Sequence, residues 1–184
     1  MPLLENTSIA LKDKSQKKIE TLKINDELIT FSIDGLENIQ NMEILQKQEI
    51  STFNGSFQES KIKNIWLDLS SEIYKINDAL LVDGSHYVFI KRNDKYYWSE
   101  VRHCIQGDEL FKLNGEWERI TKIETLETKQ NVYNVQMNKV YNYFANGYLV
   151  HNGNPCAACS ACGASAGEEE GEGSGGKGGK GGGY

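Results

Sequence analysis

The sequence predicts an all-β domain followed by a glycine-rich tail. Over residues 2–152, short apolar runs alternate with residue pairs that favour tight turns, a pattern typical of many short strands joined by hairpins. One motif recurs about half a domain further along the chain, and the large aliphatic residues stop after Asn152. These three observations predict a domain boundary at Asn152.

Five apolar runs are expected to form strands. They span residues 7–11, 27–31, 87–90, 132–135 and 148–150. The pairs that favour tight turns, because they tolerate positive φ, are Asp34-Gly35, Asn54-Gly55, Asn93-Asp94, Asn114-Gly115 and Asn146-Gly147. Residues 45–50 and 67–73 are ambiguous and also fit short helical turns.

The recurring motif suggests two related halves. Residues 23–28 (KINDEL) are similar to residues 105–110 (IQGDEL), and each copy follows a predicted hairpin, over residues 11–19 and 90–98. Such similarity predicts pseudo-twofold architecture, although a match of this length also arises by chance.

The tail differs sharply in composition. Residues 153–184 hold 12 of the 18 glycines and no Leu, Ile, Val, Phe or Met. A segment without large apolar side chains cannot offset the entropy lost on ordering. We therefore predict a disordered C-terminal tail.

Cys156, Cys159 and Cys162 form a CxxCxxC motif in this tail. Thiolates at this spacing can bind zinc or part of an iron–sulfur cluster. A complete site needs a fourth ligand, from Cys104, His151 or another chain. The alternative is a cysteine-containing tail open to oxidation or cross-linking. We expect no metal and no organic cofactor.

Composition excludes several classes of function. The formal charge of −6 argues against a general nucleic-acid binder, which usually presents a basic face. No apolar run reaches the roughly 18 residues of a membrane span, and residues 1–16 lack the pattern of a secretory signal. The cysteine pattern is not that of a disulfide-stabilised secreted domain. We expect a cytoplasmic monomer without nucleic-acid or membrane partners.

Four stretches, in order, carry a resemblance to a known family. Residues 144–152 (FANGYLVHN) combine an Asn-Gly turn with a strand that ends in His-Asn, and residues 132–135 (VYNV) stand at the matching distance upstream. Residues 3–9, 18–28 and 83–90 supply the other three stretches. This set resembles inteins and related Hedgehog-intein (Hint) self-processing domains, and it spans nearly all of residues 2–152.

The resemblance implies a Hint-type horseshoe whose two ends meet at one cleft. It also implies roles for three residues: Asn152 as the cyclising nucleophile, His151 as the acid beside it, and His86 as the cleft residue that faces the upstream bond.

The chemistry of the His151-Asn152 pair can be argued independently. The side-chain amide nitrogen of Asn can attack its own main-chain carbonyl and close a succinimide, which breaks the following peptide bond without water. Proximity removes part of the entropic cost, and a neighbouring His can supply a proton. Two alternatives compete: an ordinary surface pair in a turn, and deamidation at Asn152-Gly153, which leaves the chain intact. His86 equally suits a structural hydrogen bond.

The sequence departs from splicing members of the family at both ends. They usually begin with Cys or Ser, where this chain has Pro2, and follow the terminal Asn with Cys, Ser or Thr, where it has Gly153. Neither residue has a side-chain nucleophile. Asp83 replaces the usual Thr, while Asn134 and Tyr141 replace an Asp and a His of some relatives.

We therefore predict single-turnover autoprocessing: self-cleavage after Asn152 by asparagine cyclisation, without standard splicing, with the chain's own flanking polypeptide as substrate. One alternative is a catalytically decayed Hint fold that serves as a structural or binding module. Another is an intein whose N-terminal nucleophile has been lost or substituted, since Met1 directly precedes Pro2.

Overall fold

The computed structural model describes residues 2–36, 38, 39 and 41–152. The predicted tail, with Gly153 and the clustered cysteines, lies outside these residues. Within them, no helix is long and apolar enough to cross a membrane.

The elements are β1 (Leu3–Leu4), β2 (Ser8–Ala10), β3 (Gln16–Lys18), η1 (Ile19–Thr21), β4 (Glu27–Ile33), α1 (Met42–Leu45), β5 (Glu49–Ile50), β6 (Gly55–Ser70), β7 (Ile73–Ile76), β8 (Leu80–Asp83), β9 (Tyr87–Arg92), β10 (Lys95–Glu100), η2 (Val101–His103), β11 (Glu109–Phe111), β12 (Trp117–Arg119), β13 (Ile123–Leu126), β14 (Gln130–Met137), β15 (Asn142–Ala145) and β16 (Tyr148–His151).

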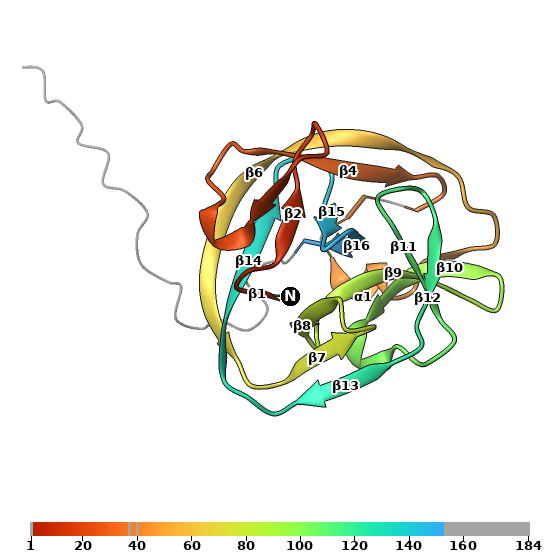
Figure 1. Ribbon diagram of the computed structural model, residues 1–184. Coiled ribbons are helices and arrows are strands. Elements are labelled where there is room, and N and C mark those ends of the chain that lie inside the picture. Colours follow the sequence, from red (N-terminus) through yellow and green to blue (C-terminus); the bar gives the residue numbers. More distant parts are fainter. Residues whose placement is uncertain (1, 37, 40, 153–184) are drawn as a thin grey trace, which may run out of the picture.

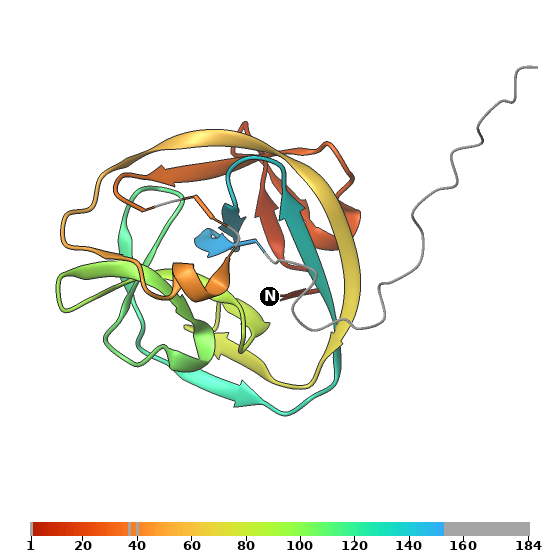
Figure 2. The ribbon, with the colours of Figure 1, turned by 180° about the vertical axis from the view of Figure 1, so that it is seen from behind.

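The strands form two antiparallel sheets. One has the order β13-β7-β8-β1-β14-β6-β4, and the other has the order β12-β11-β9-β16-β15-β2-β3, with β10 paired to β9 and β5 to β10. The long strand β6 pairs with β4 along its first half and with β14 along its second half. As a result, β6 and β14 curve around the rim while β15 and β16 lie inside it (Figures 1 and 2). The prediction of an all-β domain is confirmed.

The predicted strands are confirmed and lie in β2, β4, β9, β14 and β16. Two of the predicted turns close hairpins with positive φ at both central residues. Asn93 and Asp94 (51° and 57°) join β9 to β10, and Asn146 and Gly147 (48° and 85°) join β15 to β16. Local chemistry decides these turns because Asn, Asp and Gly tolerate the left-handed region.

The prediction of a turn at Asn54-Gly55 is wrong. Gly55 begins β6 and pairs with Ile33 of β4. A Cβ atom at this position would lie 2.2 Å from the Ser32 carbonyl oxygen, so the glycine permits a close approach of two strands. The ambiguous residues 67–73 are also mostly extended, because β6 continues to Ser70 as the partner of β14.

The two copies of the recurring motif have equivalent structures. Asn25 (φ 72°) and Gly107 (φ 101°) occupy the same left-handed position. The carboxylates of Asp26 and Asp108 each accept a hydrogen bond from the main-chain N–H three residues earlier, at 2.8 Å and 2.9 Å. Each motif follows a hairpin and a short 3-10 turn (η1 or η2) and leads into a strand, β4 or β11. The repeat therefore reflects the predicted pseudo-twofold architecture.

The inner strands β9, β16 and β15 are buried on both faces. Val88, Tyr143 and Val150 pack into one hydrophobic cluster, which also contains Leu3 of β1 and Val135 of β14. Phe89 and Leu149 pack into a second, largely aromatic cluster on the other face. Successive side chains of β16 therefore enter different clusters.

Candidate active site

The β15–β16 hairpin carries the C-terminal His-Asn pair, and its turn is fixed by side-chain hydrogen bonds. Asn146 Oδ1 accepts from Ser8 N (2.8 Å), and Asn146 Nδ2 donates to the Ala79 carbonyl (2.9 Å). The Asn146 N–H also donates to the Ser8 carbonyl (2.7 Å). These contacts attach the hairpin to both halves of the domain.

Strand β16 lies beside β9, the strand that follows His86. Val150 of β16 pairs with Val88 of β9 in antiparallel register, and His86 directly precedes β9. Because side chains alternate along a strand, His151 lies on the face of the aromatic cluster, whereas Asn152 lies on the opposite face.

His151 is almost completely buried, with 2% of its surface exposed. Its Nδ1 lies 2.8 Å from the main-chain carbonyl oxygen of Asn152, and its Nε2 lies 3.2 Å from that of Ile39. The Trp98 ring packs edge-on against it at 5.1 Å between centroids. Burial lowers the pKa of His151 to about 4, although both carbonyl contacts favour the protonated ring.

This arrangement limits how the imidazole can hydrogen-bond. A neutral imidazole has one N–H, so it can donate to only one of two carbonyl oxygens, whereas the imidazolium can donate to both. A donor at Nδ1 points at the carbonyl oxygen of the 152–153 peptide bond. It can therefore stabilise negative charge that develops on that oxygen.

Asn152 is also buried, with 1% of its surface exposed. Its main-chain N–H donates to the Tyr141 carbonyl at 2.9 Å. With the side-chain amide oriented to match its neighbours, Nδ2 donates to the same Tyr141 carbonyl (2.6 Å) and Oδ1 accepts from Met137 N (3.2 Å). Tyr141 thus contributes through its main chain at the position where some Hint relatives have a His.

The start of the domain lies against the turn that carries His86. Asp83 N donates to the Pro2 carbonyl (3.2 Å), and His86 N donates to the Asp83 carbonyl (2.9 Å). His86 is completely buried. Leu3 pairs with Tyr133 of β14, the residue before Asn134, which is half-buried.

The Asp83 carboxylate is hydrogen-bonded within its own turn and to the end of β6. It accepts hydrogen bonds from Ser85 N at 2.8 Å, from the Ser85 hydroxyl, and from the Ser70 hydroxyl. Burial opposes ionisation, but these hydrogen bonds hold the pKa of Asp83 below its usual range. The side chain thus stabilises the turn, and the Asp83 main chain contacts Pro2.

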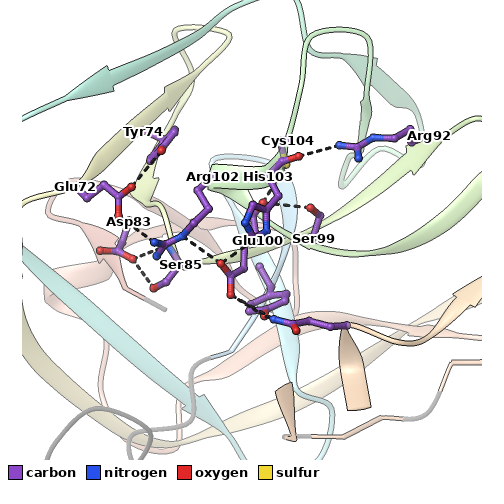
Figure 3. A network of polar contacts seen from close by, with 12 residues as sticks. Glu72, Tyr74, Asp83, Ser85, Arg92, Ser99, Glu100, Arg102, His103 and Cys104 are labelled. Carbon is purple, nitrogen blue, oxygen red and sulfur yellow. Dashed lines mark hydrogen bonds and ion pairs between the residues drawn. The ribbon is translucent and has the colours of Figure 1, made fainter. Parts of the chain in front are cut away.

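A polar network that includes Glu72, Glu100 and Arg102 lies next to the same turn (Figure 3). The main-chain N–H groups of residues 101 and 102 donate to the carbonyls of His86 (2.8 Å) and Gly84 (3.0 Å). The Arg102 guanidinium bridges Glu72 (3.3 Å) and Glu100 (3.1 Å). These residues hold the His86 main chain in place.

Several site residues carry no recognisable signal in the sequence. Ile39 and Met137 contribute through main-chain atoms, and Trp98 contributes a ring edge. Asn142 bonds both main-chain groups of Phe31, accepting from its N–H (2.9 Å) and donating to its carbonyl (2.8 Å). Only the three-dimensional fold brings them to the His-Asn pair.

The two antiparallel sheets and the repeated halves match an intein-type fold. The structure is similar to the solution structure of a bacterial intein-like domain from Clostridium thermocellum, with a TM-score of 0.61 and 19% identity over 82% of this chain and 98% of that chain. It is also similar to a DnaB intein from Synechocystis, with a TM-score of 0.60 and 13% identity over 83% of this chain and 99% of that chain.

A third similar structure is the PabCDC21-1 intein, with a TM-score of 0.60 and 16% identity over 82% of this chain and 98% of that chain. No family model and no curated protein matches the sequence. The predicted Hint-type fold is therefore confirmed by structural similarity, while the roles assigned to His86, His151 and Asn152 stay predictions.

Proposed function

We propose that this chain is an intein-like autoprocessing domain that cuts its own chain once, after Asn152. Its substrate is its own flanking polypeptide. The observation that carries the proposal is the 2.8 Å contact between His151 Nδ1 and the carbonyl oxygen of Asn152, with both residues buried. A donor aimed at this oxygen serves the bond that cyclisation would break.

The reaction is an intramolecular aminolysis. Asn152 Nδ2 forms a bond to its own carbonyl carbon, negative charge develops on the carbonyl oxygen, and the bond to the Gly153 nitrogen breaks. Nδ2 loses one proton and the departing nitrogen gains one, so no water is consumed. The products are a C-terminal succinimide at Asn152 and a new amino terminus at Gly153.

The surrounding residues favour this reaction over hydrolysis. Asn152 is 1% exposed, so water has little access to the carbonyl. The Tyr141 carbonyl receives both the N–H and the Nδ2 of Asn152, which restricts the side chain near its own main chain. Nδ2 must leave that carbonyl to attack, so cleavage is expected to be slow.

Ligation is not expected. Ester or thioester transfer needs a hydroxyl or thiol at each junction, and this chain has Pro2 and Gly153 there. Cleavage without ligation therefore follows from the side chains present at the two junctions.

Incubation of the purified chain, followed by mass spectrometry, tests the proposal. We expect a peptide that begins Gly153-Asn154-Pro155, and no ligated product. Asn152→Ala should abolish release because it removes the attacking nitrogen. His151→Ala should slow release by roughly 10²–10⁴-fold, the usual contribution of a positioned acid, and His86→Ala should slow it much less.

The outcomes separate the alternatives. If the chain deamidates at Asn152 without breaking, the domain is a scaffold that retains the Hint fold. If Pro2→Cys together with Gly153→Cys restores ligation, the chain is an intein that has lost its nucleophiles.

A further inference from the structure

The loop between β4 and α1 reaches across the aromatic face to His151. Ile39 in this loop provides the carbonyl oxygen that lies 3.2 Å from His151 Nε2. The contact matters because Ile39 and Asn152 occupy the two nitrogens of one ring, and only a doubly protonated ring can donate to both carbonyls. A carbonyl at Nε2 therefore favours the protonated ring, in which Nδ1 can donate to the Asn152 carbonyl at the same time.

Asn38, the residue before Ile39, ties this loop to the segment that precedes β15. Asn38 Oδ1 accepts from Tyr141 N (2.9 Å), and Asn38 Nδ2 donates to the Lys139 carbonyl (2.5 Å). Among the described residues, these are the hydrogen bonds that join the two segments. The Asn38 side chain thus links the loop that carries Ile39 to Tyr141, whose carbonyl accepts hydrogen bonds from Asn152.

Apolar packing and hydrogen bonds both position this loop: Leu36, Ile39 and Met42 pack against the aromatic cluster. A cavity of about 50 Å³ lies between the loop and His151, and its walls include Asn38, Trp98, Asn142 and His151. A space of this size is large enough for water, so the loop does not fill this wall. The side-chain hydrogen bonds of Asn38 therefore add to the packing of Ile39 in setting the position of the Ile39 carbonyl.

We propose that Asn38 is a positioning residue for self-cleavage: its side-chain bonds fix the Ile39 carbonyl against His151 Nε2, where it favours the protonated ring, the form that can donate from Nδ1 to the Asn152 carbonyl at the same time. The inference rests on the proposed function for its effect on rate. The contact between the Ile39 carbonyl and His151 belongs to the folded chain, so its dependence on Asn38 can be tested without cleavage.

The first test compares cleavage rates. Asn38→Ala should slow release of the Gly153 fragment roughly tenfold, because a pKa of His151 lower by about one unit leaves about one tenth as much protonated ring. Asn114→Ala is the matched control, because Asn114 is exposed and its hydrogen bonds stay within its own turn; it should leave the rate unchanged. In a His151→Ala background, Asn38→Ala should cause no further loss, because the residue acts through His151.

The second test reads the His151 ring directly. In uncleavable Asn152→Ala chains, ¹⁵N NMR should find that adding Asn38→Ala lowers the pH at which His151 titrates by about one unit, the cost of a lost charge-assisted hydrogen bond. Trp98, Ile39 and Asn152 surround this ring, and no ion pair to it is present among the described residues. If Asn38→Ala does not fold, Asn38→Asp keeps the acceptor for Tyr141 N and should give a smaller shift.

An unchanged His151 titration overturns the inference, as does equal slowing by Asn38→Ala in the presence and absence of His151. Absence of cleavage in the unmodified chain would instead refute the proposed function, and the NMR comparison would still decide the role of Asn38.

Discussion

At the scale of single residues, His151 is subject to two opposing influences. Burial disfavours its charged form, whereas carbonyl oxygens at 2.8 Å and 3.2 Å favour it. Burial prevails, and the pKa falls to about 4. Near neutral pH the ring is therefore mostly uncharged, and the imidazolium that can donate to both carbonyls is a minor species.

The same shift predicts a pH-dependent stability. The pKa of His151 is about 4 when folded, against 6.5 for an ordinary histidine, so the unfolded chain binds more protons across this window. The stabilisation is present above pH 6.5 and is lost as the pH falls to 4, a change on the order of 3 kcal/mol. Urea unfolding of Asn152→Ala chains should show this loss, whereas chains that also carry His151→Gln should lack this component. A pH-independent difference between the two would contradict the burial argument.

The site residues differ in how far the sequence could reveal them. His151, Asn152 and His86 stand in stretches with recognisable order, so their identity could be predicted. Ile39, Trp98 and Met137 could not be predicted. Ile39 and Met137 act through main-chain groups that every residue has, and Trp98 contributes a ring edge, as any core aromatic residue can. Asp83 is predicted as a cleft position, which stays a prediction; its carboxylate bonds Ser70 and Ser85.

At the scale of elements, the sequence predicts a turn correctly where the residues of the turn alone determine its backbone conformation. Asn93-Asp94 and Asn146-Gly147 both adopt the expected positive φ, because these residue types tolerate it wherever they stand. Gly55 has a different reason to be glycine, the close approach of Ser32 on a neighbouring strand. That reason depends on a pairing that periodicity alone does not specify.

These two turns differ in their surroundings, which leads to a matched prediction. Asn93→Ala and Asn146→Ala both place alanine in the left-handed region, at a cost of roughly 1–2 kcal/mol each. Asn146 also bonds Ser8 N and the Ala79 carbonyl, whereas Asn93 is exposed. Asn146→Ala should therefore lower the free energy of unfolding by about 1–3 kcal/mol more than Asn93→Ala. Urea denaturation of both variants measures the difference, and equal losses would show that the Asn146 side-chain bonds contribute nothing.

At the scale of the whole molecule, the pseudo-twofold repeat explains how distant segments meet. Each half contributes a hairpin, a 3-10 turn and an aspartate-capped turn that leads into a strand. The inner hairpin β15–β16 lies between the halves, paired to β2 of one and β9 of the other. The sequence indicated the repeat but could not indicate this insertion, since strand pairing between distant segments leaves no local pattern.

The two capping aspartates occupy equivalent positions but different environments. The Asp108 side chain is 1% exposed and pairs with Arg92 through two contacts, at 2.6 Å and 2.7 Å. The Asp26 side chain is 24% exposed and makes one contact of 2.7 Å with Lys17. Symmetry of the backbone is therefore not matched by symmetry of the electrostatics.

Removal of each carboxylate should expose this asymmetry. Asp108→Ala leaves the Arg92 guanidinium partly buried without its anion and should cost about 3–5 kcal/mol. Asp26→Ala leaves Lys17 free to reach water and should cost about 1 kcal/mol, mostly for the lost turn hydrogen bond. The free energies of unfolding of the two variants, measured in urea at neutral pH, test the comparison. Asp108→Asn is the control, because it keeps a hydrogen-bonding group and removes only the charge, so its cost should lie between the two. If Asp26→Ala and Asp108→Ala are equally destabilising, the turn geometry common to both halves, and not the buried ion pair, sets the contribution of these residues.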